Sequence, residues 1–182
     1  MDHKTKISLF QYYSWAYHLL YLFLEIMPPI IRNTAYKILL KKKGQRTLID
    51  YQVYIRYPHK ISVGSDTELN RGCSFFPGLL ADDSEIIIGN NVLISPNVCF
   101  YSTGHDYTST ERPDIGRPIV VHDDCWIGAN SIILPGVEIG KGSVIGAGSL
   151  VTKSIPPNSV AFGNPATIRK TKQNQDTQQS CY

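Results

Sequence analysis

The chain has 182 residues, which is enough for one domain with a sizeable core, or for such a domain with an appendage. Its 42% hydrophobic and 18% charged residues exclude an intrinsically disordered chain, and a net charge of +3 is too small to indicate a nucleic-acid partner. Four widely spaced cysteines without a CxxC pair argue against a structural zinc site and against a disulfide framework. Because the first apolar run also lacks a signal-peptide cleavage pattern, we expect a cytoplasmic protein.

Composition divides the chain into three regions. Residues 1–60 are rich in aromatic and aliphatic side chains, residues 61–166 in Gly, Ile, Val and Asn, and residues 167–182 in Lys, Gln, Thr and Asn. We therefore predict an N-terminal helical segment, a central repeat domain and a frayed C-terminal tail with these boundaries.

The N-terminal region has the residue spacing of two helices. The first ends at Pro28-Pro29, and the second, over residues 30–40, ends at a cationic turn and Gly44. The apolar stripe of the first helix consists of Leu9, Phe10, Tyr13, Tyr17, Leu20, Phe23, Leu24 and Met27.

Two roles are open for this region. His18 and Glu25 make residues 7–27 a poor membrane span, but the aromatic side chains and the basic residues suit peripheral contact of residues 1–46 with the inner face of a membrane. The alternative, and the more common use of such helices, is packing against the rest of the chain or a neighbouring subunit.

The central region repeats every six residues. β-Branched residues recur without a slip at Val121, Ile127, Ile133, Ile139, Ile145 and Val151. Such a period is neither helical nor that of a simple alternating strand; it fits one short strand and one tight corner per repeat. Three repeats close a triangular turn, and stacked turns form a parallel β-helix with the periodic aliphatic residues in its core. The predicted fold class is therefore all-β.

The repeat is interrupted twice, and the longer interruption carries the best candidate for chemistry. Residues 101–120 form a long insertion, and His105 stands near its start. An imidazole at the base of a loop beside a rigid coil is suited to removing a hydroxyl proton near neutral pH. His122 falls at a corner position, where we expect a solvated side chain. No nucleophile motif is present, so direct transfer from an activated acyl donor is the simplest mechanism.

The segment from Ile88 to Ala166 resembles the hexapeptide-repeat acyltransferases, above all the maltose, galactoside and nodulation-factor O-acetyltransferases and the polysaccharide acetyltransferases of bacterial surface-glycan pathways. The matching motifs are Ile88 to Val98, Thr103-Gly104-His105, Pro118 to Val121, Trp126 to Asn130, Ile133 to Val137, Ile145 to Lys153 and Gly163 to Ala166.

The resemblance implies a left-handed parallel β-helix, a homotrimer with active sites between adjacent subunits, acetyl-CoA as acyl donor, no metal, and His105 as general base. It also implies a donor site, in which the Ala129 N–H is a candidate oxyanion donor. The positions matching the family's coenzyme-binding residues are Trp126, Ala129, Ala147, Thr152, Lys153 and Pro165. Arg169 and Lys170 are candidate partners of the coenzyme's 3′-phosphate, and the alternative is that they belong to a solvated basic tail.

The acceptor site departs from the family pattern. Phe75 stands where the sugar acetyltransferases have an acceptor-binding Asn, and we expect its ring to stack on a sugar face. Asp82 and Asp83 match acidic positions that could hold acceptor hydroxyls. The acceptor is expected to be a saccharide or a lipid-linked saccharide, and the group that orients His105 stays open among Asp83, Asp106, Asp114 and a backbone carbonyl.

Three other functions share this repeat. N-acetylation of an amino sugar needs the same donor site, and the sequence does not separate it from O-acetylation. A metal lyase of the γ-carbonic-anhydrase type needs three His ligands, of which only His105 and His122 are suitably spaced. The intact loop and C-terminal motif argue against a non-catalytic trimeric scaffold.

Overall fold

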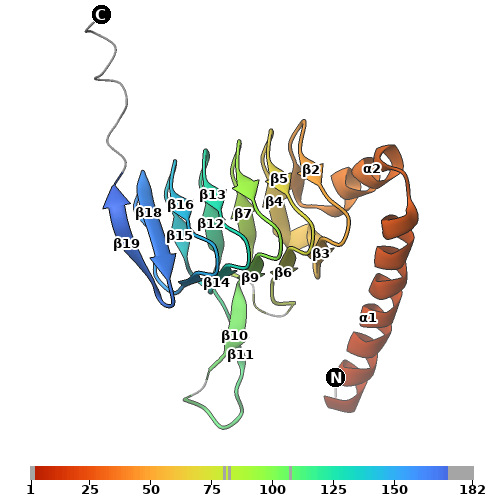
Figure 1. Cartoon of the computed structure of the whole chain (residues 1–182). Helices are drawn as coiled ribbons and strands as arrows, with labels where there is room; N and C mark the ends of the chain where they lie inside the picture. Colours follow the sequence, from red (N-terminus) through yellow and green to blue (C-terminus); the bar gives the residue numbers. More distant parts are fainter. Residues whose placement is uncertain (1–2, 80, 82, 107, 172–182) are drawn as a thin grey trace, which may run out of the picture. The chain divides into compact units, whose positions relative to one another are not determined.

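The computed structural model describes residues 3–79, 81, 83–106 and 108–171 (Figure 1). Contacts divide the chain into two compact units that meet between Ile38 and Leu39. The first unit is helical and the second is built of short strands. Within the described residues, no helix combines the length and the apolar character needed to span a bilayer.

The helical unit contains α1 (His3–Ile26) and α2 (Pro29–Leu39). The proline pair separates them, and Pro29 takes the first position of α2, where a missing N–H costs nothing. Arg32 joins the helices through an ion pair of 3.1 Å with Glu25, and its guanidinium lies over the ring of Tyr36. Burial raises the pKa of Tyr36 to about 12, and Arg32 opposes this rise.

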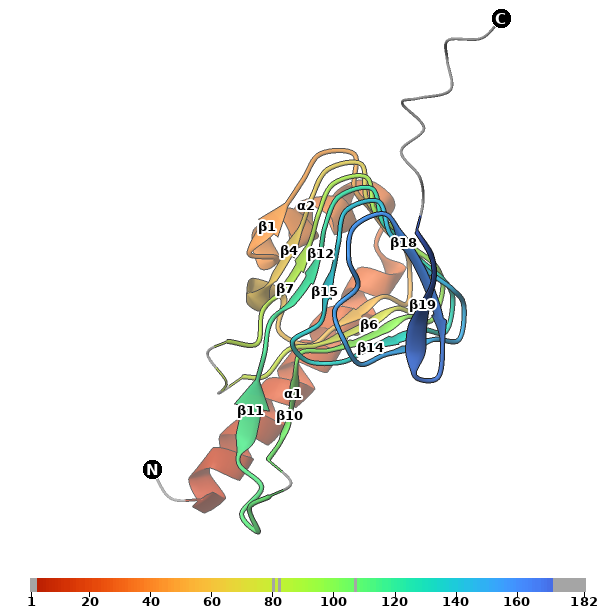
Figure 2. The same cartoon turned by 90° about the vertical axis from the view of Figure 1, so that its left-hand side faces the viewer.

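The second unit is a three-sided coil, because successive strands from β1 to β9 and from β12 to β17 visit three parallel sheets in rotation. Figure 2 looks along the stack and shows the turns superimposed. The first sheet contains β1 (Lys42–Lys43), β4 (Ile61–Val63), β7 (Ile86–Ile88), β12 (Ile119–Val121) and β15 (Glu138–Ile139). The second contains β2 (Leu48–Ile49), β5 (Glu68–Leu69), β8 (Leu93–Ile94), β13 (Trp126–Ile127), β16 (Val144–Ile145), β18 (Ser159–Gly163) and β19 (Ala166–Thr171). The third contains β3 (Tyr54–Ile55), β6 (Ser74–Phe76), β9 (Cys99–Tyr101), β14 (Ile132–Ile133) and β17 (Leu150–Val151).

Three corners connect these sheets. The first corner leads from the first sheet to the second, the second corner from the second sheet to the third, and the third corner from the third sheet back to the first. A 3-10 turn, η1 (Pro58–Lys60), and the inserted hairpin of β10 (Thr103–His105) and β11 (Asp114–Gly116) both lie at the third corner.

The periodic aliphatic residues fill the core, as the six-residue repeat predicted. All six residues of the uninterrupted run are buried: Val121, Ile127, Ile133, Ile139, Ile145 and Val151. The parallel register stacks each of them on the same position of the next turn, as in the pair Ile127 and Ile145. The core is therefore a set of aliphatic columns that run along the coil.

Corner residues satisfy the backbone where strands end. Asn97 and Asn130 have positive φ values of 61° and 59°, a conformation that Asn tolerates better than most residues. Buried hydroxyls donate to carbonyls of the next turn, as from Ser143 Oγ to Pro156 O at 2.8 Å. Small polar residues at these corners thus replace water as hydrogen-bond partners.

Both boundaries of the predicted repeat domain need correction. The coil begins at Lys42 rather than at residue 61, since β1 pairs with β4. The six-residue period does not reveal this first turn, for two reasons. The η1 turn adds two residues between Ile55 and Val63, and Lys43 occupies a position that is aliphatic in other turns. At the other end, β19 pairs with β18 as far as Thr171, within the region predicted to fray.

The Cys73 thiol offers a test of the buried corners. Burial raises its pKa to about 11, and its Sγ donates to Ser95 O at 3.2 Å. The thiolate is therefore scarce at neutral pH and increases only as the pH approaches this value. We expect iodoacetamide at pH 8 to modify the partly exposed Cys99 well before Cys73, as read by mass spectrometry of peptides. Faster modification of Cys73 would contradict the burial.

Candidate active site

The insertion at the third corner folds as a hairpin. Strand β10 pairs antiparallel with β11, and His105 faces Asp114 across the pair. The hairpin leaves the stack of turns in Figure 1, so its residues are not part of the core. The side chain of His105 is 67% exposed.

Two acceptors hold one ring nitrogen of His105. Its Nδ1 lies 3.1 Å from Asp114 Oδ1 and 3.1 Å from the Arg112 carbonyl oxygen. Neither acceptor has a proton to give, so Nδ1 carries the hydrogen and Nε2 is the basic nitrogen of the neutral ring. Within the described residues Nε2 has no hydrogen-bond partner, which leaves it available for a hydroxyl proton.

Of the other candidates for orienting His105, Asp106 is engaged elsewhere. Its Oδ1 accepts hydrogen bonds from the backbone N and the Oγ1 of Thr108, and these bonds lower the pKa of Asp106. Asp83 is exposed on the segment between β6 and β7. The structure thus answers the open question with Asp114 and the Arg112 carbonyl.

A second segment at the third corner packs beside the base of the hairpin, and its described residues are 77–79, 81 and 83–85. Ser102 Oγ donates to Ser84 O at 2.6 Å, and a Cβ on Gly116 would lie 2.6 Å from the Cβ of Ala81. Asp83 therefore belongs to the same corner as His105. Asp82, its predicted companion, lies outside the described residues.

Lys60 holds this segment and was missed by the sequence analysis. Its Nζ donates to the carbonyls of Gly78 and Ala81, both at 2.7 Å, and to Ser84 Oγ at 3.2 Å. One ammonium thus satisfies acceptors that point inward from an irregular loop. A lysine just before a strand carries no sequence signal for such a role, because its partners come from the next turn.

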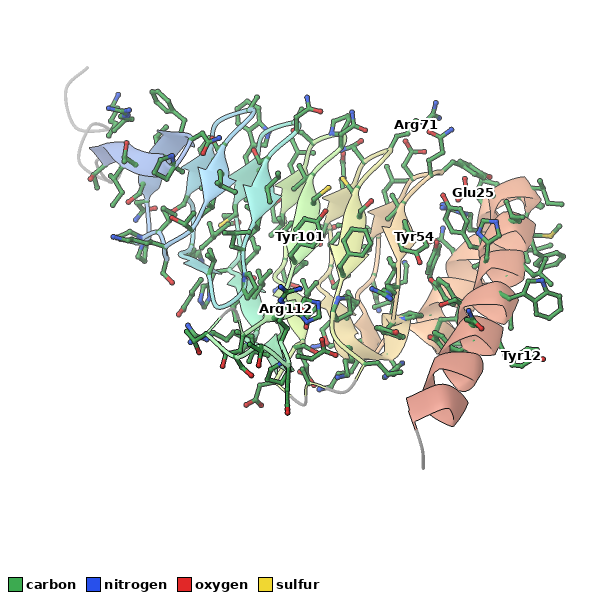
Figure 3. All side chains as sticks on the ribbon, turned by 90° about the horizontal axis from the view of Figure 1, so that it is seen from below. Tyr12, Glu25, Tyr54, Arg71, Tyr101 and Arg112 are labelled. Carbon is green, nitrogen blue, oxygen red and sulfur yellow. The ribbon has the colours of Figure 1, made fainter. Side chains whose placement is uncertain are left out.

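Phe75 is a correction to the predicted acceptor site. Its side chain is 0% exposed and stacks on Phe100 with ring centroids 4.9 Å apart. It therefore belongs to the core and cannot contact a sugar. The outward residue is its neighbour Phe76, which lies in a row of rings between Tyr54 and Tyr101, both labelled in Figure 3.

The second corner assembles part of the predicted donor site. Ala129 and Ala147 occupy the same position in successive turns, since Gly148 N donates to Ala129 O at 2.8 Å. Pro165 is exposed in the turn between β18 and β19, at the same corner one turn further. Trp126 precedes this row on β13, half exposed, with its Nε1 donating to Ser95 Oγ at 2.9 Å.

The row has a backbone donor, and its successive turns lie close together. The Ala129 N–H makes no hydrogen bond within the described residues. The adjacent Gly128 lets the turns approach, because a Cβ there would lie 2.5 Å from the Ala147 nitrogen. We call the row of half-buried Ala129 and exposed Ala147 and Pro165, with Trp126 at its start, the donor strip.

Three other predicted donor residues lie off this strip or at its end. Thr152 and Lys153 are exposed at the third corner, after β17. Arg169 on β19 is exposed, with its guanidinium over the ring of Phe162. One chain therefore places His105 and the donor strip at different corners of the coil.

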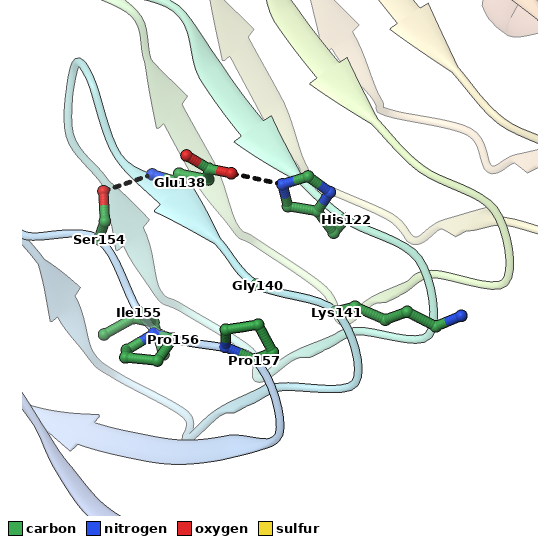
Figure 4. Close-up of a pocket in the computed structure, with 8 residues that line it drawn as sticks. All are labelled: His122, Glu138, Gly140, Lys141, Ser154, Ile155, Pro156 and Pro157. Carbon is green, nitrogen blue, oxygen red and sulfur yellow. Dashed lines mark hydrogen bonds and ion pairs between the residues drawn. The ribbon is translucent and has the colours of Figure 1, made fainter.

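An open pocket of about 460 Å³ lies at the first corner (Figure 4). His122 Nε2 lies 2.6 Å from Glu138 Oε1, and Glu138 N donates to Ser154 Oγ at 3.0 Å. His122 is exposed, as predicted for a corner residue, but it is paired with a carboxylate. Within the described chain, no group of three or more His, Cys, Asp or Glu residues could hold a metal ion.

Asp114 supplies a test of the hairpin geometry. Replacing Asp114 by Asn should lower kcat by about 10- to 100-fold, because the variant loses the charge that stabilises the protonated ring, while the Arg112 carbonyl still orients it. The KM for the acyl donor should stay within about twofold. Steady-state kinetics measure both quantities. An unchanged kcat would show that Asp114 has no role in the reaction. Thr108→Ala, which instead removes one of the two hydrogen bonds to Asp106, is the matched control.

Comparison with known proteins identifies the family. The family model for bacterial transferase hexapeptide (six repeats) matches residues 118–153. Galactoside O-acetyltransferase of Escherichia coli (strain K12) is 37% identical over 148 residues, which are 80% of this chain and 70% of that protein. A protein of the same strain, named as the colanic acid biosynthesis acetyltransferase WcaF, is 34% identical over 127 residues, 70% of this chain and 67% of its own length.

A solved structure agrees with these relatives. The hexapeptide-repeat acetyltransferase from Vibrio cholerae O1 biovar eltor, in complex with acetyl coenzyme A, aligns with a TM-score of 0.78 and 29% identity, over 86% of this chain and 85% of that one. Parallel sheets, the six-residue period, the inserted hairpin and extensive identity to acetyltransferases lead to one assignment. The chain belongs to the hexapeptide-repeat acetyltransferases.

Proposed function

We propose that the protein transfers an acetyl group from acetyl-CoA to a hydroxyl of a sugar or of a surface-polysaccharide precursor, with His105 as general base. The observation that carries the proposal is the fixed imidazole: Nδ1 is held by Asp114 and the Arg112 carbonyl, and Nε2 has no hydrogen-bond partner among the described residues. Sugar or polysaccharide acetylation is the activity in the names of the relatives.

The proposed step needs only one proton acceptor and one oxyanion donor. His105 Nε2 takes the proton of the acceptor hydroxyl while its oxygen attacks the thioester carbonyl carbon. The Ala129 N–H donates to the carbonyl oxygen as negative charge develops on it. When the carbon–sulfur bond breaks, the protonated His105 returns its proton to the departing thiolate.

The donor strip has the form that an extended coenzyme requires. Small side chains at Ala129 and Ala147 leave a shallow surface along the coil, and the half-exposed Trp126 ring can form one wall. Arg169 and Lys170 are exposed cations on β19, beyond the strip, and could pair with phosphate oxygens.

A complete site then needs two copies of the chain. Because His105 and the donor strip lie at different corners, we propose that the hairpin of one subunit meets the strip of its neighbour in a homotrimer of left-handed coils. In a closed ring of identical subunits every interface is the same, so each one pairs the third corner of one subunit with the second corner of its neighbour. Thr152 and Lys153 share the third corner with His105 and would approach the coenzyme from that side.

Mixing two inactive variants tests this shared site. His105→Ala removes the base, and Ala147→Trp fills the strip. Co-expression should restore part of the activity, because some interfaces pair an intact hairpin with an intact strip. No restoration in mixed assemblies of confirmed composition, or a stable monomer by light scattering, would place the whole reaction within one chain.

The acceptor is tested by a screen. Acetyl-CoA is incubated with galactosides, maltose, lipid-linked saccharides and amino sugars, and free thiol release is followed. We expect hydroxyl acceptors to be acetylated after treatment with chelator as well as before. Exclusive use of amino sugars would replace O-acetylation by N-acetylation, and zinc-dependent activity would contradict the proposed mechanism.

A further inference from the structure

The outer face of α1 carries an apolar stripe that the described structure leaves in water. We call it the outer stripe: Tyr12, Trp15, Leu19, Leu22 and Ile26. These residues follow one another at steps of three and four, so they share one face of the helix. Each is between 47% and 76% exposed. Large contiguous apolar surfaces of this kind mark contacts with other molecules.

The opposite face of α1 is the one used within the chain. Leu24 is buried there, Leu20 is half-buried, and Glu25 holds the ion pair with Arg32. Figure 3 shows Tyr12 and Glu25 on different sides of the helix. The helix is thus apolar on both faces, and only one face is covered in the described residues.

Charge is distributed unevenly along the sequence. The helical unit, residues 1–38, contains four basic and two acidic residues, of which Arg32 and Glu25 pair with each other, whereas the remaining 144 residues contain fourteen basic and thirteen acidic ones. The unit that exposes the outer stripe therefore carries a net positive charge, whereas the charges of the coil nearly balance. A cationic segment is attracted to anionic lipid headgroups.

From these observations we infer that α1 lies in the surface of an anionic membrane, with the outer stripe inserted at the level of the headgroups. Tyr12 and Trp15 supply the amphipathic rings that favour this interface. Leu19, Leu22 and Ile26 supply the apolar area that reaches the acyl chains. The inference concerns the location of the enzyme and is independent of its acceptor.

A second copy of α1 is the competing occupant, because steps of three and four also occur in coiled coils. Coiled coils are usually specified by charged pairs beside the seam. Residues 7–24 contain no Asp, Glu, Lys or Arg, so such pairs cannot form along the stripe. The absence of these charges favours a lipid surface.

Vesicle flotation of the full chain tests the inference. We expect binding to vesicles of phosphatidylcholine with phosphatidylglycerol and much weaker binding to phosphatidylcholine alone. Salt should weaken the binding to the anionic vesicles, because it screens the attraction between lysines and headgroups. The combined variant Trp15→Ser, Leu19→Ser and Leu22→Ser should bind at least about tenfold more weakly. Tyr13→Ser removes a ring of the same helix outside the stripe and should bind like the parent chain.

Further measurements keep the outcome decisive. Coenzyme A binding and circular dichroism report whether the variants are folded, and light scattering reports their mass. Brominated lipid should quench the tryptophan fluorescence of the parent chain more than that of Trp15→Phe. This measurement remains possible even where the triple variant does not fold. Unchanged lipid binding of a folded stripe variant would overturn the inference, as would equal quenching. Loss of assembly mass with intact lipid binding would assign the stripe to a second copy.

Discussion

Replacing His105 by Ala should lower kcat by about 10²- to 10⁴-fold, the usual contribution of a positioned general base. The imidazole is exposed on the hairpin and, in the part of the chain that the structure describes, is bonded only through Nδ1, so its loss removes the proton acceptor without opening the core. The dissociation constant for acetyl-CoA should change little, because in the proposed site the imidazole contacts the acceptor hydroxyl and only the thioester end of the donor. Steady-state kinetics and calorimetric titration with coenzyme A measure the two effects.

His122→Ala is the matched control. That residue is also an exposed, carboxylate-paired histidine, but it lies at the first corner. It should keep most of the activity and the same coenzyme affinity. Near-normal turnover of His105→Ala at saturating acceptor would refute the assigned role. Joint loss of coenzyme binding and assembly would show instead that His105 maintains structure.

Replacing Phe75 by Ala should lower the free energy of unfolding by about 3–5 kcal/mol, because the substitution empties a fully buried site. The cavity would lie against Phe100, whose ring is stacked on Phe75 at 4.9 Å. Phe100 is continuous with the hairpin through β9, so activity should fall mainly through loss of folded enzyme. Urea unfolding at fixed protein concentration measures the change.

Phe76→Ala is the control for this substitution. Phe76 is half-buried on the outer side of the same strand and stacks on Tyr101 at 5.0 Å. Its loss should cost about 1 kcal/mol. If Phe75→Ala were as stable as the parent chain and had a raised KM for the acceptor, Phe75 would contact the acceptor, as the sequence comparison first suggested.

The core of the coil could be predicted from the sequence because it depends on a period. A residue six positions after a buried aliphatic residue is also buried, and this rule holds from Val121 to Val151. The same rule places Phe75 inside, since it continues the phase of Val63 and Leu69. Because the family has an acceptor-binding Asn at this position, the sequence comparison suggested that Phe75 contacts the acceptor. The packing of the core buries it instead.

The site could be predicted only in part. His105 stood out because it begins a long interruption, but its partners depend on the register of an antiparallel pair that the repeat does not encode. Lys60 was missed because its four acceptors belong to another turn. The first turn, from Lys42, was missed because two extra residues shift its phase.

The spacing of the strands has a consequence for how such an enzyme can change. Between paired positions, the first and second corners always take six residues, as from Val63 to Leu69 and from Leu69 to Phe75. The third corner takes 13 residues from Phe75 to Ile88 and 21 from Phe100 to Val121. Every described insertion between β1 and β17 is therefore confined to one edge of the prism, the edge that bears His105. Loops at that edge can be lengthened or exchanged without moving any strand, so the surroundings of His105 can change in evolution while the donor strip at the second corner keeps its geometry.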